Sequence, residues 1–381
     1  MKISRRSAVP AFIVMDVMRA AEEREVAGGD VLHMEVGQPS TGAPAGVVAA
    51  AKRALDDGIL GYTLALGIEP LRRRIADYYR SDYGVEVPAE RIVVTTGSSG
   101  AFLLSFLAAF DPGDRVAILR PGYPCYRNIL SALQITPVDV PVGPGTRFQP
   151  TIDDLERAGG KDLDGLLIAS PANPTGSMLA DDELASILSY CRDNGIRYLS
   201  DEIYHGITFE RPATTALALD PDVVVINSFS KYFSMTGWRL GWMVLPEELL
   251  RPVERLAQNL FISPPSLSQH AAVAAFDCRD ELEANVARYR RNRDVLLDGL
   301  PQAGFGKLSP ADGAFYIYAD VSALTNDSQE FCTAMLRETG IAATPGHDFD
   351  PTDGAAAMRF SFAGSTEHMK LAVERLKAWL R

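Results

Sequence analysis

Short apolar runs alternate with segments of helical periodicity through the first three quarters of the chain. Runs of strand length occupy residues 92–96, 166–169, 196–199, 222–227 and 239–245. Such runs are typical of strands buried on both faces, and the helices between them serve as crossover connections. The pattern over residues 45–279 therefore predicts a large α/β domain, whose mostly parallel central sheet carries helices on both faces.

The pattern changes after residue 279. A long charged helix, a strand, a second helix, a second strand and a closing helix are expected, in this order, at residues 281–300, 313–318, 328–338, 357–362 and 367–381. Near the amino terminus, residues 10–23 have apolar side chains at helical spacing, at Phe12, Val14, Met15 and Met18. We expect residues 1–44 and 280–381 to form together a smaller α+β domain.

Composition narrows the class of protein. With 381 residues and 47% hydrophobic content, the chain can bury a large core and exceeds the usual size of a single-core domain. Acidic residues outnumber basic ones, 49 to 37, and the net charge of -12 argues against nucleic acid as a partner. The four cysteines and five histidines lack metal-ligand spacing, so we expect reduced thiols and no metal site.

The amino terminus loosely resembles a secretion signal, because the twin arginines Arg5 and Arg6 precede an apolar stretch. Asp16 and Arg19 interrupt that stretch before it reaches the length of a membrane span. We therefore expect the segment to belong to the folded protein, with no membrane association and a cytoplasmic location.

Hydroxyl, lysine and arginine side chains gather after the predicted strand 222–227. Ser228, Ser230 and Lys231 follow this strand, and Arg239 opens the next one, which would fix it through its backbone. Ligands bind at the carboxyl ends of strands in open α/β sheets. A lysine amine forms a Schiff base with an aldehyde, while arginine and hydroxyl groups hold a phosphate dianion. The combination suits pyridoxal 5'-phosphate, with Lys231 as the residue bonded to its carbon.

Three other predicted strands also end in small or polar residues. One runs into a Gly-Ser-Ser-Gly turn containing Ser98 and Ser99, which opens a helix expected over residues 101–110. Such a turn offers free backbone N–H groups to an anion. The other two strand ends are followed by Asn173, Asp201 and Tyr204.

These motifs stand in a fixed order along the chain. They read Asn173-Pro174-x-Gly176, then Asp201-x-x-Tyr204, then Ser228-x-x-Lys231 with Arg239 eight positions after the lysine. In this order the chain resembles the fold-type I, class I/II aminotransferase family, from about Gly37 to Arg359. The resemblance implies a fold-type I transferase that depends on pyridoxal 5'-phosphate.

The resemblance also implies a role for each residue at the cofactor. Lys231 would form the Schiff base and move the Cα proton, and Asp201 would keep the pyridine nitrogen protonated. Asn173 and Tyr204 would hydrogen-bond the phenolic oxygen, and Tyr123 would stack on the ring. The phosphate would be surrounded by Ser98, Ser99, Ser228, Ser230 and Arg239.

Substrate and subunit contacts follow from the same resemblance. Arg359 matches the arginine that binds the substrate α-carboxylate, and Gly37 matches the glycine whose main chain approaches it, with Asn173 as a further substrate contact. Tyr62 matches the tyrosine that reaches the phosphate of the neighbouring subunit, which implies a homodimer.

The resemblance implies the transfer of an amino group from an L-amino acid to a 2-oxo acid by a ping-pong mechanism. A carbon-sulfur β-lyase, or another enzyme that cleaves the Cα–H bond, stays open because such enzymes share the cofactor and the lysine. A cofactor-sensing transcription regulator would need an added DNA-binding module, and here the enzyme pattern begins almost at Met1.

The motifs leave the donor side chain open. In the aspartate-type subgroup, an arginine for the distal carboxylate comes from the region of residues 257–268, which here reads AQNLFISPPSLS and contains no arginine. We therefore expect no strong dicarboxylate preference by that route, and aspartate and glutamate stay open by other routes.

Overall fold

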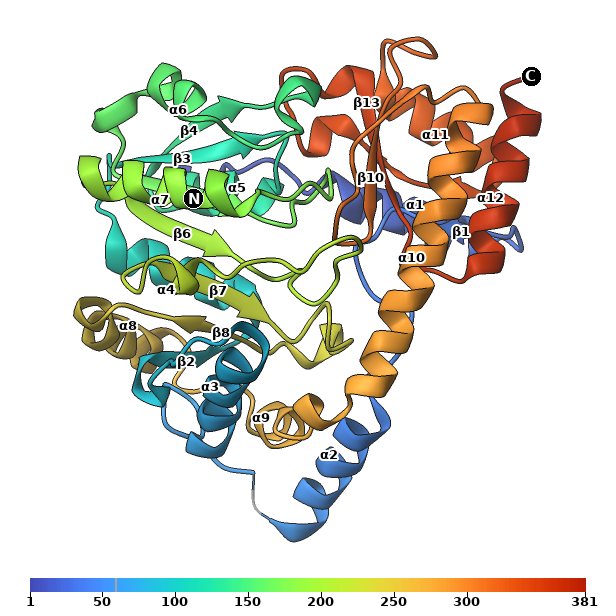
Figure 1. Cartoon of the computed structure of the whole chain (residues 1–381). Coiled ribbons are helices and arrows are strands. Elements are labelled where there is room, and N and C mark those ends of the chain that lie inside the picture. Colours follow the sequence, from blue (N-terminus) through green and yellow to red (C-terminus); the bar gives the residue numbers. More distant parts are fainter. Residues whose placement is uncertain (59) are drawn as a thin grey trace.

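A seven-stranded sheet forms the centre of the protein (Figure 1). The computed structural model describes residues 1–58 and 60–381. In spatial order the strands are β2 (Ile92–Thr95), β8 (Gly241–Val244), β7 (Val224–Ser228), β6 (Arg197–Asp201), β5 (Gly165–Ala169), β3 (Arg115–Arg120) and β4 (Thr136–Pro141). The five strands from β7 to β4 run parallel to one another, which confirms the predicted mostly parallel sheet.

Strand β8 differs from its prediction. It pairs antiparallel with both β2 and β7, and it begins at Gly241. Arg239 lies before the strand, after the 3-10 helix Thr236–Trp238, and has a left-handed backbone with a φ of 53°. The prediction that a strand fixes Arg239 is therefore wrong. The side chain of Arg239 is directed instead by its own left-handed backbone conformation. This conformation costs a non-glycine residue roughly 1 kcal/mol or more.

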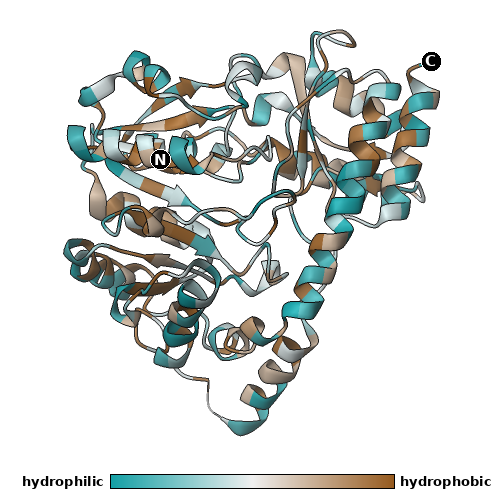
Figure 2. Ribbon diagram, in the orientation of Figure 1, coloured by the Kyte–Doolittle hydropathy of each residue, from teal (hydrophilic) through white to brown (hydrophobic). Residues whose placement is uncertain are grey.

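Alternate side chains of the central strands enter two separate cores, one on each face of the sheet. Leu167 and Ile226 pack with α4 (Gly97–Ala109), α5 (Pro124–Ala132) and α8 (Glu247–Leu260). Leu166 and Val225 pack on the other face with α3 (Glu69–Tyr83) and α7 (Asp181–Asn194). Figure 2 shows the hydrophobic strands between helices with hydrophilic outer surfaces. Burial on both faces explains why these strands are apolar throughout.

A second, antiparallel sheet lies beside the first. Its order is β12 (Thr344–Pro345), β13 (Ala357–Ser361), β10 (Tyr316–Asp320) and β9 (Lys307–Leu308). Three helices accompany it, and their bounds differ from the predicted ones by only a few residues. They are α10 (Arg279–Gln302), α11 (Ser328–Thr339) and α12 (Thr366–Trp379).

The amino-terminal segment joins this second part of the molecule. Strand β1 (Leu32–His33) pairs parallel with β11 (Ile341–Ala342), and α1 (Ile13–Val26) contacts β11 and β12. The helix predicted over residues 10–23 is therefore confirmed, with a later start. The remaining helices are α2 (Ala45–Asp57), which packs on α9 (Ser266–Ala272), and α6 (Ile152–Ala158), which packs near β4.

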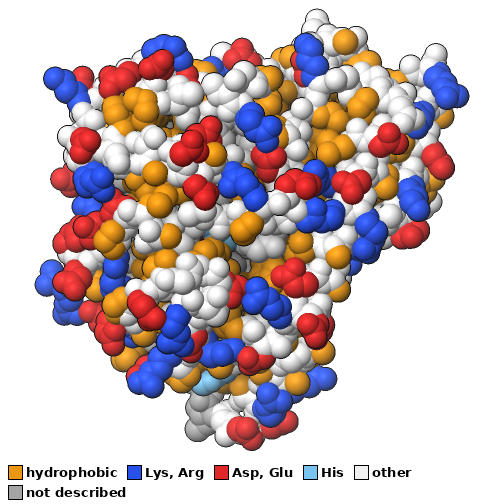
Figure 3. All heavy atoms as spheres, viewed as in Figure 1, with side chains coloured by type: hydrophobic (Ala, Val, Ile, Leu, Met, Phe, Trp, Pro, Cys, Tyr) orange, Lys and Arg blue, Asp and Glu red, His pale blue; other side chains and the backbone are white. Residues whose placement is uncertain are grey.

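Charged side chains of the described residues are interspersed by sign on the face in Figure 3. Among the helices that the structure describes, none has the length and apolar composition needed to cross a bilayer.

Candidate active site

A cavity of about 190 Å³ lies where the carboxyl ends of the parallel strands meet the second sheet. Asp201 ends β6, Lys231 follows β7, and Arg359 lies on β13. The topology thus brings together groups that are far apart in the sequence. The predicted residues that line the cavity are Gly37, Ser98, Ser99, Tyr123, Asn173, Asp201, Tyr204, Ser230, Lys231, Arg239 and Arg359.

The amine of Lys231 points into this cavity between polar and aromatic groups. Its Nζ donates a hydrogen bond to the carbonyl of Gly37 at 2.5 Å and lies 5.9 Å from the ring centroid of Tyr204. Burial, followed by the charges of Arg359 and Arg239, lowers the pKa of Lys231 to about 8. A lowered pKa makes this amine a better base and nucleophile at neutral pH.

The carboxyl group of Asp201 is buried at the end of β6. Burial raises the pKa of Asp201 to about 6, although the Tyr126 hydroxyl and the backbone N–H of Ile203 both donate to the carboxylate and lower it. The Ile203 bond is 3.0 Å long. These two donors stabilise the charged form in a place where water is excluded.

Arg359 is a buried cation in the lining of the cavity, with 3% of its surface exposed. Its Nη1 donates to Asn173 Oδ1 at 2.9 Å, and its Nη2 donates to the carbonyl of Glu35. The guanidinium carbon lies 4.4 Å from the ring centroid of Tyr316 and 4.7 Å from that of Phe349. Its Nε has no partner among the described residues. The fork is rigidly held, and an anion is the ligand that would complete it.

Gly37 and Tyr316 meet so closely that position 37 accepts no side chain. A Cβ atom on Gly37 would lie 1.8 Å from the hydroxyl of Tyr316. That hydroxyl also lies 2.8 Å from the hydroxyl of Tyr204. Because Gly37 has no side chain, its main chain can approach Lys231 and Arg359 closely. Tyr204 and Tyr316 lie beside it in the lining of the cavity.

The other end of the cavity is built to receive an anion. Gly97 has a φ of +68° at the start of α4, and a Cβ atom there would lie 2.5 Å from Arg239 Nη2. Ser98 and Ser99 follow in the first turn of α4, because the helix begins at Gly97 and not at residue 101 as predicted. The amino terminus of a helix and a guanidinium group together favour a phosphate.

Two predicted residues lie outside the cavity lining. Ser228 is buried behind it, where its hydroxyl donates to Ser230 Oγ at 2.9 Å. Tyr62 lies on the loop between α2 and α3 and is 84% exposed. Residues 257–268 do not belong to the described lining of this cavity.

Several lining residues were missed by the sequence analysis. Tyr126 lies three positions after Tyr123, whose edge it meets with ring centroids 5.2 Å apart. Helical spacing after Tyr123 could have indicated it. Tyr316 opens β10 and carries no motif. Helix α1 contributes Val14, Met15 and Met18, and Phe12 precedes the helix at its cap.

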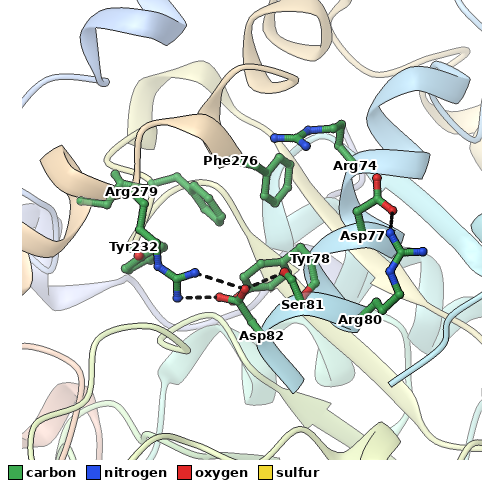
Figure 4. Close-up of a pocket in the computed structure, with 11 residues that line it drawn as sticks. Arg74, Asp77, Tyr78, Arg80, Ser81, Asp82, Tyr232, Phe276 and Arg279 are labelled. Atoms are coloured by element: carbon green, nitrogen blue, oxygen red, sulfur yellow. Dashed lines mark hydrogen bonds and ion pairs between the residues drawn. The ribbon is translucent and has the colours of Figure 1, made fainter. Parts of the chain in front are cut away.

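A second cavity lies between α3 and the start of α10 (Figure 4). Its guanidinium groups are already neutralised, since Arg80 pairs with Asp77 and Arg279 pairs with Asp82 at 3.1 Å. None of the predicted site residues belongs to its described lining. The cavity between the two sheets is therefore the candidate active site.

Comparison with known proteins identifies the family. The model of aminotransferase class I and II matches residues 29–376. The chain belongs to this family. This aminotransferase is 50% identical to the valine-pyruvate aminotransferase of Mycobacterium tuberculosis, over 100% of this chain and 98% of that protein. It is 30% identical to the aspartate aminotransferase of Sulfurisphaera tokodaii, over 97% of this chain and 94% of that protein.

The fold agrees with this membership. A crystal structure of an aminotransferase from Mycobacterium tuberculosis superimposes with a TM-score of 0.97 at 50% identity, covering 100% of this chain and 99% of the other. The resemblance inferred from the motifs is thus confirmed, and so are the fold and the transfer of an amino group to a 2-oxo acid. These relatives support amino transfer over carbon-sulfur cleavage.

Proposed function

We propose that this aminotransferase binds pyridoxal 5'-phosphate in the cavity between the two sheets and exchanges the amino group there. The observation that carries the proposal is the convergence of Lys231, Asp201 and Arg359 on one cavity. The residues fit the cofactor, because Gly97 leaves room for Arg239 beside the amino terminus of α4. That end of the cavity suits a phosphate. Elsewhere in the cavity, the carboxylate of Asp201 suits a protonated ring nitrogen, and the guanidinium group of Arg359 suits a carboxylate.

Each predicted residue would hold one part of the cofactor. Arg239, Ser230 and the first N–H groups of α4 would bind the phosphate, with Ser228 holding Ser230 in place. Asp201 would face the ring nitrogen, Tyr123 would cover the ring, and the phenolic oxygen would meet Asn173 and Tyr204. When bound, the cofactor supplies an aldehyde that reacts reversibly with amines and a ring that takes up the electron pair of the Cα–H bond.

Lys231 would be the residue that bonds the cofactor and then moves the proton. With a pKa of about 8, roughly one amine in ten is unprotonated at pH 7, against fewer than about one in a thousand for an ordinary lysine. The Nζ atom could then take the proton from the substrate Cα and return it to another carbon, acting first as base and then as acid.

The groups around Lys231 would orient the cofactor and the substrate for this proton transfer. Asp201, with a pKa of about 6, is mostly ionised at neutral pH and would stabilise a proton on the ring nitrogen. Arg359 would bind the α-carboxylate through its fork, beside the main chain of Gly37. Because Arg359 is buried and held by several contacts, it would orient the substrate.

The relative at 50% identity is named a valine-pyruvate aminotransferase, so valine and pyruvate are the first donor and acceptor to consider. The relative named for aspartate is more distant, at 30% identity. We therefore propose a small amino acid and a small 2-oxo acid as the substrates.

We further propose a homodimer in which Tyr62 completes the partner's site. Apolar side chains are exposed together near this loop, including Tyr62, Leu64, Leu260 and Ile262. The loop is joined to residues 263–268 by hydrogen bonds, such as Ser266 Oγ to the carbonyl of Gly61 at 2.7 Å. Ser268 in turn donates to the carbonyl of Trp238, next to Arg239. An exposed apolar surface continuous with the phosphate end of the site suits a second copy of the chain.

Two broader proposals accompany this one. We propose that the enzyme acts in the cytoplasm, since its four cysteines are free thiols, as a reducing compartment would keep them. We also propose that residues 45–279 form one domain, and that residues 1–44 and 280–381 form the other. The cavity would lie between them, as ligand sites often do.

A nitrogen-transfer assay tests the proposed function. Purified enzyme with added cofactor, ¹⁵N-valine and pyruvate should form ¹⁵N-alanine and 3-methyl-2-oxobutanoate in equal amounts, with the parallel initial-rate lines of ping-pong kinetics. Lys231→Ala should abolish the transfer and keep the fold. No labelled alanine from valine, together with release of ammonia, pyruvate and a thiol from an S-alkylcysteine, would contradict amino transfer and favour a carbon-sulfur β-lyase.

A further inference from the structure

Helix α1 brings an apolar wall to the cavity. Val14 and Met18 are four residues apart and lie on one helical face, with Met15 beside them and Phe12 at the cap before the helix. The other side of the helix faces α11, where Val17 lines a separate small cavity. The side of α1 that faces the active site is therefore apolar throughout.

Contacts at the start of α1 fix this wall beside the substrate anchors. The carboxylate of Asp348 accepts hydrogen bonds from the backbone N–H groups of Ile13 at 2.9 Å and Val14 at 3.3 Å. The next residue, Phe349, stacks on Arg359. These contacts tie the start of the helix to the arginine proposed to bind the α-carboxylate.

The start of α1 is also tied to the residue proposed to cover the ring. The ring of Phe12 meets that of Tyr123 edge to face, with centroids 5.9 Å apart. A substrate held by its carboxylate and its amine would therefore have α1 beside its side chain.

Every charged group of the described lining already has another task. These groups are Asp201, Lys231, Arg239 and Arg359, which the proposed function assigns to the cofactor and the α-carboxylate. The polar residues Gln38 and Thr236 share a neighbouring surface hollow with Arg239, at the phosphate end. A second carboxylate placed against α1 would thus lose water and meet no cation in the described lining.

We propose that α1 reads the substrate side chain, and that Phe12, Val14, Met15 and Met18 select apolar amino acids over aspartate and glutamate. The proposal rests on the proposed function and adds the class of side chain. In an apolar pocket one methylene group is worth roughly tenfold or more in kcat/KM. An unpaired carboxylate is disfavoured more strongly, because burying a charge without a partner is costly. The two methionines adapt to side chains of different shape.

A donor series with one acceptor tests the selection. With pyruvate as acceptor, kcat/KM for valine and methionine should exceed that for aspartate and glutamate by roughly 100-fold or more. Equal values for aspartate and valine would overturn the selection and leave amino transfer intact. The absence of nitrogen transfer with every donor would instead overturn the proposed function.

Variants of α1 test the residues. Met18→Ala should lower kcat/KM for methionine roughly tenfold more than for alanine, because only the longer side chain loses its contact. The matched control is Val17→Ala, the same kind of truncation on the side of the helix that faces α11, which should leave the donor ratios unchanged. If Met18→Ala lowers kcat/KM equally for methionine and alanine, α1 does not read the side chain. The same conclusion follows if Val17→Ala changes the ratio of these two values as much as Met18→Ala does.

A binding measurement provides a readout without turnover. Met15 is half exposed, so Met15→Arg should fold normally and add a cation at the wall. Calorimetry on the enzyme with its cofactor should give 3-methylbutanoate an affinity roughly tenfold higher than succinate. Met15→Arg should raise the affinity for succinate relative to 3-methylbutanoate. An unchanged ratio in this variant, or tighter binding of succinate by the unmodified enzyme, would overturn the proposal.

Discussion

Tyr126 adjusts the charge of the central carboxylate. Burial raises the pKa of Asp201 to about 6, and the hydrogen bond from Tyr126 is the largest influence that lowers it. In Tyr126→Phe this donor is lost, so the pKa of Asp201 should rise further and the carboxylate should ionise only at higher pH. We expect the acid limb of the profile of kcat/KM against pH to move up by about one pH unit, or ~1.4 kcal/mol.

The matched control removes a tyrosine hydroxyl elsewhere. Tyr190 donates to Glu156 at 2.6 Å, outside the described lining of the cavity. Tyr190→Phe should keep the acid limb in its place. If Tyr126→Phe also keeps it, Tyr126 does not control the ionisation of Asp201.

Arg359 should act on the substrate and not on the cofactor. Arg359→Lys keeps the charge but loses the planar fork, so KM should rise and kcat/KM should fall by roughly 2 to 4 kcal/mol. The affinity for pyridoxal 5'-phosphate, measured by titration of the cofactor-free protein, should change little, because Arg239 and not Arg359 is proposed to bind the phosphate. Loss of cofactor with an unchanged KM would mean that the two arginines have been assigned the wrong way round.

Strand-end residues could be predicted at this scale, whereas supporting residues could not. Lys231 and Asp201 follow apolar strands, and parallel strands bring such ends together. Tyr316 is positioned by tertiary packing, which leaves no periodic signal in the sequence, and Tyr126 is indicated only by its helical spacing from Tyr123. The direction of the Arg239 side chain could not be predicted, because it depends on the left-handed backbone of Arg239 itself, just before β8.

Helix α1 depends on a carboxylate that lies far away in the sequence. Asp348 accepts two backbone N–H groups at the start of the helix, a type of contact worth about 0.5–2 kcal/mol. Asp348→Ala should therefore speed hydrogen exchange in the first turns of α1, measured by mass spectrometry. It should also lower kcat/KM for apolar donors, while the cofactor stays attached to Lys231.

A second capping aspartate provides the control. Asp327 caps α11 through the N–H groups of Gln329 and Glu330. Asp327→Ala should speed exchange at the start of α11 and leave α1 unchanged. Unaltered exchange in α1 of Asp348→Ala would show that the cap does not hold this helix.

Most elements could be predicted from periodicity, and their ends could not. Helices α10, α11 and α12 agree with the apolar spacing because each buries one stripe. Helix α4 starts at Gly97, earlier than predicted, because the small residues that open it form its first turn. The two-residue strands β1 and β11 are too short to produce a pattern, although their pairing joins the amino-terminal segment to the second sheet.

Assembly is tested by mixing two variants. Sedimentation of the unmodified enzyme should give a dimer. A hybrid of Tyr62→Phe and Lys231→Ala subunits has one site with both Lys231 and Tyr62, if Tyr62 serves the partner. That hybrid should recover about half the activity of the unmodified dimer, and its intact site should bind the cofactor more tightly than Tyr62→Phe alone. A fully active monomer, or a hybrid without recovery, would contradict the composite site.

The order of the strands in the whole molecule could not be read from the sequence. The apolar runs predict strands and a parallel majority, but β8 is antiparallel to both neighbours. Pairing across the sheet also depends on packing between distant segments, such as α4 with α8. The motif order nevertheless indicated the family, because the site places strict demands on residues at strand ends.

The central claim is that Lys231 is the amine that bonds the cofactor in this cavity. Borohydride reduction of the enzyme with pyridoxal 5'-phosphate, followed by peptide mapping, tests it directly. We predict that the reduced cofactor is found on the peptide containing Lys231, that Lys231→Ala carries no label, and that prior addition of an amino donor lowers the labelling. Stoichiometric label on a different lysine would contradict the account.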